Sequence, residues 1–185
     1  MRCYPEKRSP NNAHLVRKQA IIEAKGFDLL VMGRPEGAGC YCAANNIIRK
    51  YMDKLADNYP YTVMDNEAGL EHLSRRTTQD TDLLLIISDS SVRGVMTAGR
   101  IGELVKELDL NVKRPVLIVN RVQDGTSGDR SLLRAIEQQG VEFAGFVPAD
   151  ELIFEYDLNG KPLIQLPADS KALMSFYAVL DKLIP

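Results

Sequence analysis

Two of the three cysteines in this chain, Cys40 and Cys42, are separated by a single residue and follow a glycine-rich turn. Thiolates are soft ligands, and two of them on a short loop can bind one transition-metal ion. Two sulfurs do not complete a tetrahedral or square-planar site, so other residues or a second copy of the chain must supply the remaining ligands. A disulfide between these cysteines would close a small, strained ring. The spacing therefore indicates a metal site and suggests a dimer.

A second group of polar residues follows the apolar stretch 61–64, which ends at Asp65 and leads into a turn containing Glu67 and Gly69. In nucleotide-hydrolysing α/β proteins an Asp at the end of a strand binds Mg²⁺, and the turn after it senses the terminal phosphate. The residues are equally compatible with a plainer reading, in which Asp65 ends a strand and caps a helix while Glu67 is solvated. Both interpretations remain open at this point.

Two further segments end apolar runs in the same way. Asn120 offers a hydrogen-bond donor and an acceptor, which suits the edge of a purine, and Arg121 could stack on a base or pair with an acid. A simple turn would also explain this pair. The next segment follows the apolar run 143–147 and could begin a helix. Capping of that helix would be an ordinary explanation for its residues, which are Pro148, Ala149, Asp150 and Glu151.

The elements that must position these residues follow from the apolar pattern. Short, branched apolar runs predict strands over residues 27–33, 61–65, 83–88, 115–120, 143–147 and 162–166. Amphipathic stretches between them predict helices over 43–57, 70–79, 92–108, 129–139 and 168–184, the third of these capped by Ser90 or Ser91. The alternation predicts an α/β fold, a doubly wound and mainly parallel sheet with helices on both faces. Ligands of such sheets bind beyond the carboxyl ends of the strands, where the polar segments fall.

Length and composition limit the class of protein. A chain of 185 residues predicts one domain over 1–185, with residues 1–10 irregular. A net charge of −2 without a basic run argues against nucleic-acid binding. Neither a long apolar run nor a signal peptide is present, so we expect a cytoplasmic protein without a membrane segment. In a reducing compartment, closely spaced cysteines favour metal chemistry over a disulfide framework.

The phosphate-binding pattern Gly-x-x-x-x-Gly-Lys-[Ser/Thr] does not occur in these 185 residues. The stretch Gly125–Ser131 resembles it in composition alone, because it lacks the lysine and contains an Asp that would repel phosphate. It predicts a surface loop. No Ser/His/Asp spacing typical of a covalent hydrolase is found either.

Residues 31–46 and 64–76, together with 92–94 and 120–121, resemble the MinD-like group of deviant P-loop ATPases, and within it the CooC-type maturation factors of nickel-dependent carbon monoxide dehydrogenase. The resemblance implies an ATP-dependent homodimer that helps to load nickel into that client enzyme. By the matching motifs, Cys40 and Cys42 would bind Ni²⁺ or Zn²⁺ jointly with the same pair of the partner. Asp65 would be the Mg²⁺-linked acid, Asn66 to Gly69 the switch, and Asn120 with residues 148–151 the adenine site.

Members of that family begin with a strand and a lysine-containing phosphate loop, which would lie before the first residue of this sequence. True loss of the phosphate loop, a misassigned gene start or a split gene would each produce this difference. The loop supplies much of ATP affinity and rate, so we expect negligible ATP turnover by the chain alone. The leading hypothesis is therefore a CooC-like nickel-handling maturation factor with an incomplete ATPase core. One alternative is a nucleotide-dependent switch of the full-length type, of which this chain is a fragment. Another is a dimeric binding module that works without nucleotide.

Overall fold

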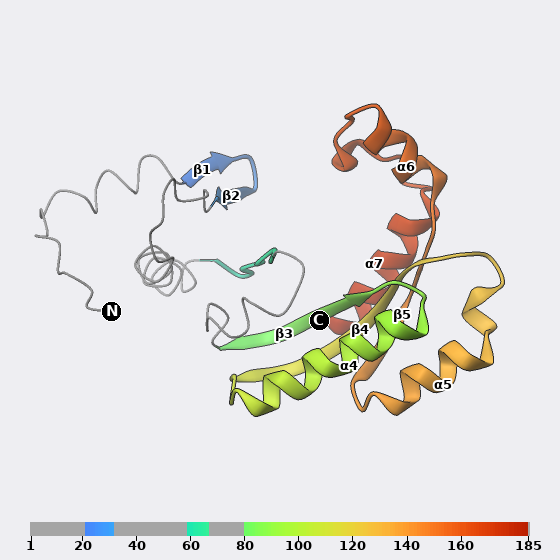
Figure 1. The fold of residues 1–185 in the computed structure, drawn as a ribbon. Helices are drawn as coiled ribbons and strands as arrows, with labels where there is room; N and C mark the ends of the chain where they lie inside the picture. The colour runs from blue at the N-terminus through green and yellow to red at the C-terminus, as the bar shows by residue number, and fades with distance from the viewer. Residues whose placement is uncertain (1–20, 32–58, 67–79, 185) are drawn as a thin grey trace, which may run out of the picture. The chain divides into compact units, whose positions relative to one another are not determined.

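The computed structural model describes residues 21–31, 59–66 and 80–184 (Figure 1). The chain divides into two compact units, Met1–Met64 and Asp65–Pro185. The single-domain organisation stays a prediction. The helices predicted over 43–57 and 70–79 lie outside the described residues.

In the first unit, β1 (Ile21–Ala24) and β2 (Phe27–Leu30) form an antiparallel hairpin. The connecting turn contains Gly26, whose φ of +93° suits a tight two-residue connection. The prediction of a parallel strand over 27–33 is wrong in its pairing, because the turn lets this segment pair with the strand just before it. The predicted strand over 61–65 is also wrong, since this stretch joins no ladder. Tyr59 donates a hydrogen bond to the Asp28 carboxylate, which raises the pKa of Tyr59.

The second unit contains a parallel sheet in the order β3 (Thr81–Ser88), β4 (Val112–Val122) and β5 (Glu142–Pro148). Its helices follow the predicted alternation and are α4 (Val92–Glu107), α5 (Arg130–Gln138), α6 (Glu151–Leu158) and α7 (Lys171–Leu183), with short turns η1 (Thr126–Gly128) and η2 (Leu163–Gln165) (Figure 1). The α/β class is confirmed. The strand predicted over 162–166 is wrong, because Pro162 and Pro167 bracket it and cannot donate to a ladder.

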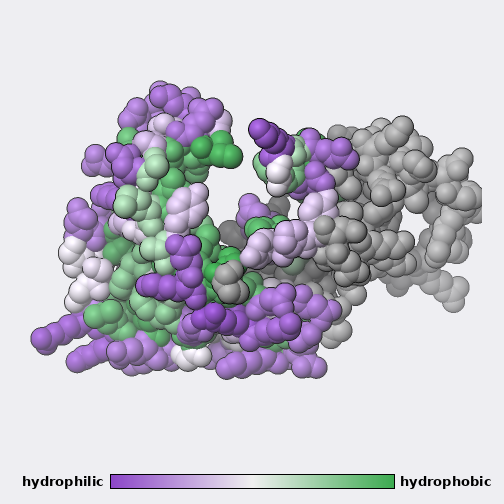
Figure 2. Space-filling view, turned by 180° about the vertical axis from the view of Figure 1, so that it is seen from behind, coloured by the Kyte–Doolittle hydropathy of each residue, from purple (hydrophilic) through white to green (hydrophobic). Residues whose placement is uncertain are grey.

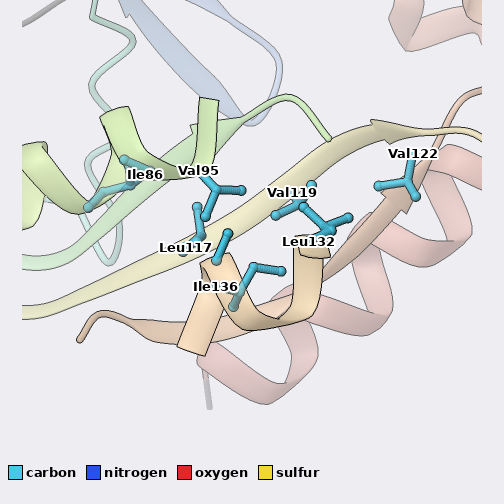
Figure 3. Close-up of a cluster of buried hydrophobic side chains, with 9 residues drawn as sticks. Ile86, Val95, Leu117, Val119, Val122, Leu132 and Ile136 are labelled. Carbon is cyan, nitrogen blue, oxygen red and sulfur yellow. The ribbon is translucent and has the colours of Figure 1, made fainter. Parts of the chain in front are cut away.

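The central strand β4 is buried on both faces. Leu117 and Val119 point into the cluster formed with α4 and α5, which includes Val95 and Leu132 (Figure 3). The alternate residues Val116 and Ile118 belong to a second cluster, which the α7 residues Ala172, Val179 and Leu183 complete. All four β4 side chains are at most 1% exposed. Helices therefore cover both faces of the sheet, which is why its central strand is apolar without alternation.

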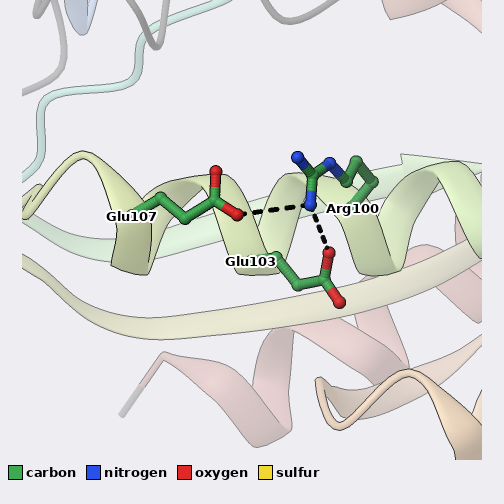
Figure 4. A network of polar contacts seen from close by, with 3 residues as sticks. All are labelled: Arg100, Glu103 and Glu107. Atoms are coloured by element: carbon green, nitrogen blue, oxygen red, sulfur yellow. Dashed lines mark hydrogen bonds and ion pairs between the residues drawn. The ribbon is translucent and has the colours of Figure 1, made fainter.

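Helix α4 lies close to its neighbours because small residues line its inner side. A Cβ at Gly99 would be 2.0 Å from Gln139 Oε1, and one at Gly102 would be 2.6 Å from Val141 Cγ2. The outer side of α4 has a different character. There Arg100 Nη1 lies 2.8 Å from Glu103 Oε2 and 3.2 Å from Glu107 Oε1 (Figure 4). These ion pairs are exposed and contribute little to stability.

Cross-strand ion pairs join the strands near their amino ends. Lys113 Nζ in β4 lies 2.7 Å from Asp82 Oδ1 in β3. Arg114 in β4 donates two hydrogen bonds to Glu142 in β5, with Nε 3.0 Å from Oε2 and Nη2 2.7 Å from Oε1. This second pair has the bidentate geometry that gives an ion pair directional specificity.

Candidate functional site at the carboxyl edge of the sheet

The polar segments that follow β3, β4 and β5 lie at one edge of the sheet. The register pairs Ser88 with Val119 and Val122 with Pro148, so the three parallel strands end side by side. The backbone N–H of Ala149 donates to the carbonyl oxygen of Val122 at 2.9 Å. The structure thus brings Asn120 and Arg121 next to Pro148 and Ala149, as expected for parallel strands.

A bulge displaces Asn120 and Arg121 from the ladder. The register between β4 and β5 shifts between Val119 and Val122, and Arg121 has a φ of +54°. A left-handed backbone at a non-glycine residue costs about 1–2 kcal/mol. Bulges of this kind re-aim side chains and are common beside functional sites. The side chain of Asn120 is half-buried and that of Arg121 is exposed.

The carboxamide of Asn120 is held by its own backbone. Its Oδ1 accepts a hydrogen bond of 2.8 Å from the N–H of Arg121. A carboxamide oxygen accepts two hydrogen bonds and its nitrogen donates two. No described residue accepts from Asn120 Nδ2. The group therefore presents a donor and a remaining acceptor side by side, in an orientation that the bulge fixes.

Asp89 directly follows β3, which ends at Ser88, across from this bulge. Its Oδ1 accepts hydrogen bonds from the N–H of Ser91 at 3.0 Å and from Ser91 Oγ at 2.6 Å. These bonds lower the pKa of Asp89, and the positive charge of Arg121 adds to the effect. Gly94 makes room for the carboxylate, because a Cβ there would be 2.2 Å from Asp89 Oδ1. The sequence reasoning did not single out Asp89, although an acid directly after an apolar strand was the signal used for Asp65.

Asp150 joins two helix N-termini. Its Oδ1 accepts from the N–H of Leu152 at 3.0 Å and caps α6. Its Oδ2 accepts from Ser170 Oγ at 2.7 Å and from the N–H of Ala172 at 3.2 Å, at the start of α7. The hydrogen bond from Ser170 lowers the pKa of Asp150. Both carboxylate oxygens are thus engaged within the protein, and a contact of Asp150 with nucleotide stays a prediction.

The neighbours of Asp150 differ in role. Pro148 ends β5 instead of opening the helix, and the half-buried Ala149 connects the two elements. Glu151 lies in the first turn of α6, where a negative charge is favourable. Gly125 precedes the η1 turn, Thr126–Gly128, and Asp129 then caps α5 through the N–H groups of Ser131 and Leu132.

The remaining predicted site residues are only partly described. Asp65 is exposed and outside any strand. Glu67 and Gly69, like the predicted metal ligands Cys40 and Cys42, lie outside the described residues. Within residues 21–31, 59–66 and 80–184 no group of three or more His, Cys, Asp or Glu side chains could hold a metal ion. In the same part of the chain, no helix has the length and apolarity needed to cross a membrane.

Comparison with known proteins gives several relatives. No family model matches the chain. Two uncharacterized ATP-binding proteins of Methanocaldococcus jannaschii are similar to it: one is 42% identical over 90% of this chain and 65% of the relative, and the other 35% identical over 84% and 60%. The carbon monoxide dehydrogenase accessory protein CooC of Rhodospirillum rubrum is 29% identical over 92% of this chain and 65% of its own length. The chain therefore spans 60% to 65% of these relatives.

Two solved structures of ATPase-related proteins have a similar fold. The MinD cell division protein of Aquifex aeolicus superposes with a TM-score of 0.63 at 19% identity, over 76% of this chain and 60% of that one. A ParA family ATPase from Chlorobium tepidum gives a TM-score of 0.65 at 19% identity, over 91% and 67% of the two chains.

Proposed function

We propose that this chain, a relative of the MinD/ParA-like P-loop ATPases, binds ATP with the adenine ring at the Asn120–Arg121 bulge. The observation that carries the proposal is the bulge itself. It places a half-buried carboxamide and an exposed guanidinium at the carboxyl end of the central strand, beside Pro148 and Ala149. This edge is where open α/β sheets bind their ligands.

The carboxamide of Asn120 favours adenine over guanine. Adenine presents a donor at N6 next to an acceptor at N7, which complements the acceptor and donor of a carboxamide. Guanine presents two acceptors at the same positions, so the carboxamide oxygen would face the O6 oxygen. Arg121 lies outside the regular strand pairing, so its guanidinium can stack on the adenine ring. The negative charge of Asp89, after β3, attracts this guanidinium.

Phosphate and metal contacts would come from another part of the chain. We assign Asp65 to Mg²⁺, through water, with Glu67 and Gly69 in the phosphate-sensing turn. The ATP-binding relatives and the motif resemblance support this assignment. Bound Mg²⁺ would neutralise phosphate charge. The carboxylate of Asp65 is exposed, so a hydrated cation can reach it.

Calorimetric titration of the full chain with Mg²⁺-ATP and Mg²⁺-GTP tests the base site. Asn120→Ala should weaken ATP binding by about 10- to 100-fold, the equivalent of one bidentate base contact. Asn111→Ala is the matched control, because Asn111 precedes β4 at the opposite edge of the sheet. Unchanged ATP affinity in Asn120→Ala, or equal affinity of the native chain for ATP and GTP, would refute adenine recognition by this residue.

As a second part of the proposal, the chain handles nickel as cargo for a nickel carbon monoxide dehydrogenase in the cytoplasm, as a homodimer joined at the Cys40–Cys42 loop. The similarity to CooC over 92% of the chain supports it. Metal analysis after gel filtration should find one Ni²⁺ or Zn²⁺ per dimer, lost in Cys40→Ser/Cys42→Ser and retained in Cys3→Ser. Equal metal content in the native protein and the double variant would contradict the assignment.

A further inference from the structure

A short lobe of the second unit exposes several large apolar side chains. The lobe comprises residues 151–166, which are α6, the connection after it and η2. Phe154 is 71% exposed, Leu158 74% and Ile164 86%, and Leu163 adds to them. Figure 2 shows hydrophobic side chains at the surface in this part of the molecule. Exposed apolar clusters on soluble proteins commonly mark interaction sites.

The two sides of α6 have opposite characters. Ile153 packs against the core cluster on the α7 side of the sheet, and Leu152 and Tyr156 are half-buried. The outward stripe, at positions i, i+3, i+4 and i+7, consists of four exposed residues in which acids alternate with apolar side chains: Glu151, Phe154, Glu155 and Leu158. The outward face of α6 is thus both apolar and acidic.

The lobe is held in shape by its own contacts. Tyr156 donates a hydrogen bond of 3.0 Å from its hydroxyl to the carbonyl oxygen of Gln165 in η2. The N–H of Lys161 donates to the carbonyl oxygen of Tyr156 at 2.8 Å, and Lys161 Nζ lies 5.3 Å from the centre of the Tyr156 ring. A surface that is already ordered loses less conformational entropy when a partner binds.

We propose that the outward face of the α6 lobe is a docking site for a basic amphipathic helix of a partner protein. Phe154 and Leu158, one helical turn apart, would contact apolar residues of that helix. Glu151 and Glu155 would pair with Lys or Arg at its rim, since opposite charges favour one register and speed association.

The charge of the lobe disfavours two other occupants. Glu151, Glu155 and Asp157 give it three negative charges. The cation in the lobe, Lys161, lies over Tyr156, and Lys171 at the start of α7 borders Glu151 and Glu155. A second copy of the chain that docks through the same face would place carboxylates against carboxylates. An anionic lipid surface would repel the same groups. A partner with apolar residues flanked by Lys or Arg meets neither obstacle.

Binding of two labelled synthetic helices to the full chain tests this proposal. One helix presents leucines along one face and lysines elsewhere, and the other replaces each lysine by glutamate. We expect the leucine–lysine helix to bind and Phe154→Ser/Leu158→Ser to weaken it about tenfold or more, as truncation of central contact residues does. Met174→Ser/Tyr177→Ser, which removes two comparably exposed apolar side chains of α7, is the matched control and should bind as the native chain does.

Reversal of charge provides a second measurement that does not depend on the apolar variant. Glu155→Lys should weaken the leucine–lysine helix and strengthen the leucine–glutamate helix. Equal binding of the leucine–lysine helix to the native chain and to Phe154→Ser/Leu158→Ser would overturn the proposal. So would a dimer, or adsorption to vesicles of phosphatidylserine, that is present in the native chain and lost in that variant, because the face would then have a different occupant.

Discussion

Replacement of Asp150 by alanine removes the carboxylate that joins α6 to α7, and we expect it to lower the free energy of unfolding by about 2–4 kcal/mol. The substitution removes three hydrogen bonds, and two of them account for most of this value; the third, from the N–H of Ala172, is the longest at 3.2 Å. The bond of 3.0 Å to the N–H of Leu152 caps α6, and loss of such a cap costs about 1 kcal/mol. The bond of 2.7 Å from Ser170 Oγ satisfies a hydroxyl that is 1% exposed, and a buried donor without an acceptor costs about 1–3 kcal/mol.

Urea unfolding followed by far-ultraviolet circular dichroism measures this cost, because the chain contains no tryptophan to report by fluorescence. Asp129→Ala is the matched control. Asp129 caps α5 through the N–H groups of Ser131 at 2.8 Å and Leu132 at 3.0 Å, without a bond to a second helix. The control should cost about 1 kcal/mol. The difference between the two variants reports the hydrogen bonds that Asp150 accepts at the start of α7, from Ser170 Oγ and from the N–H of Ala172.

The reasoning fails if Asp150→Ala costs no more than Asp129→Ala at an unchanged dependence on urea. A double-mutant cycle with Ser170→Ala gives an independent check. Residues that share one hydrogen bond should show a coupling energy of about 0.5–3 kcal/mol. Additive effects of Asp150→Ala and Ser170→Ala would show that the bond between them does not stabilise the fold.

Three further outcomes are expected. The pKa of Asp150 is lowered in the folded chain, so the ionised carboxylate stabilises the fold fully above its ordinary pKa of about 3.9. This stabilisation is lost as the pH falls through the pKa of the folded state. The free energy of unfolding of the native chain should therefore fall more steeply in acid than that of the Asp150→Asn variant. Arg121→Gly should raise the free energy of unfolding by about 1 kcal/mol in urea titrations, because glycine adopts the left-handed backbone without strain, and should weaken ATP binding. Gly94→Ala should change the free energy of unfolding by less than about 1 kcal/mol in the same titration, because the added Cβ displaces only the exposed Asp89 carboxylate while alanine favours the helix by about 1 kcal/mol; a much larger loss would mean that the turn after β3 cannot shift.

Much of the second unit could be predicted from local patterns. The branched apolar run in β4 indicated a strand covered on both faces, and Val116 to Val119 are buried on both sides of the sheet. The prediction stopped short at Pro115 because Lys113 and Arg114 are charged. Their partners, Asp82 and Glu142, lie on other strands, so the local sequence around β4 does not indicate these ion pairs. Ser91 was one of two candidate caps of α4, and its Oγ accepts from the N–H of Gly94.

The parts that could not be predicted depend on residues distant in sequence or on backbone geometry. Asp150 and Ser170 are twenty positions apart, and nothing in the local sequence indicates that one carboxylate caps two helices. The bulge at Asn120 and Arg121 has no sequence signal, because the residue that adopts the left-handed backbone is an arginine. The hairpin of β1 and β2 did have a sequence signal, the turn at Gly26. The prediction of parallel pairing did not take this turn into account.

The cross-strand ion pairs and the bulge together give the sheet a gradient of stiffness along its strands. Arg114 holds Glu142 with two hydrogen bonds, so the spacing of β4 and β5 is fixed at their amino ends. At the other end the ladder is interrupted at Asn120 and Arg121. Local opening requires least free energy where backbone bonds are fewest. Amide exchange should therefore be faster at Asn120 and Arg121 than at the buried residues Val116 to Val119, so a ligand at the carboxyl edge would meet the part of β4 that opens most readily.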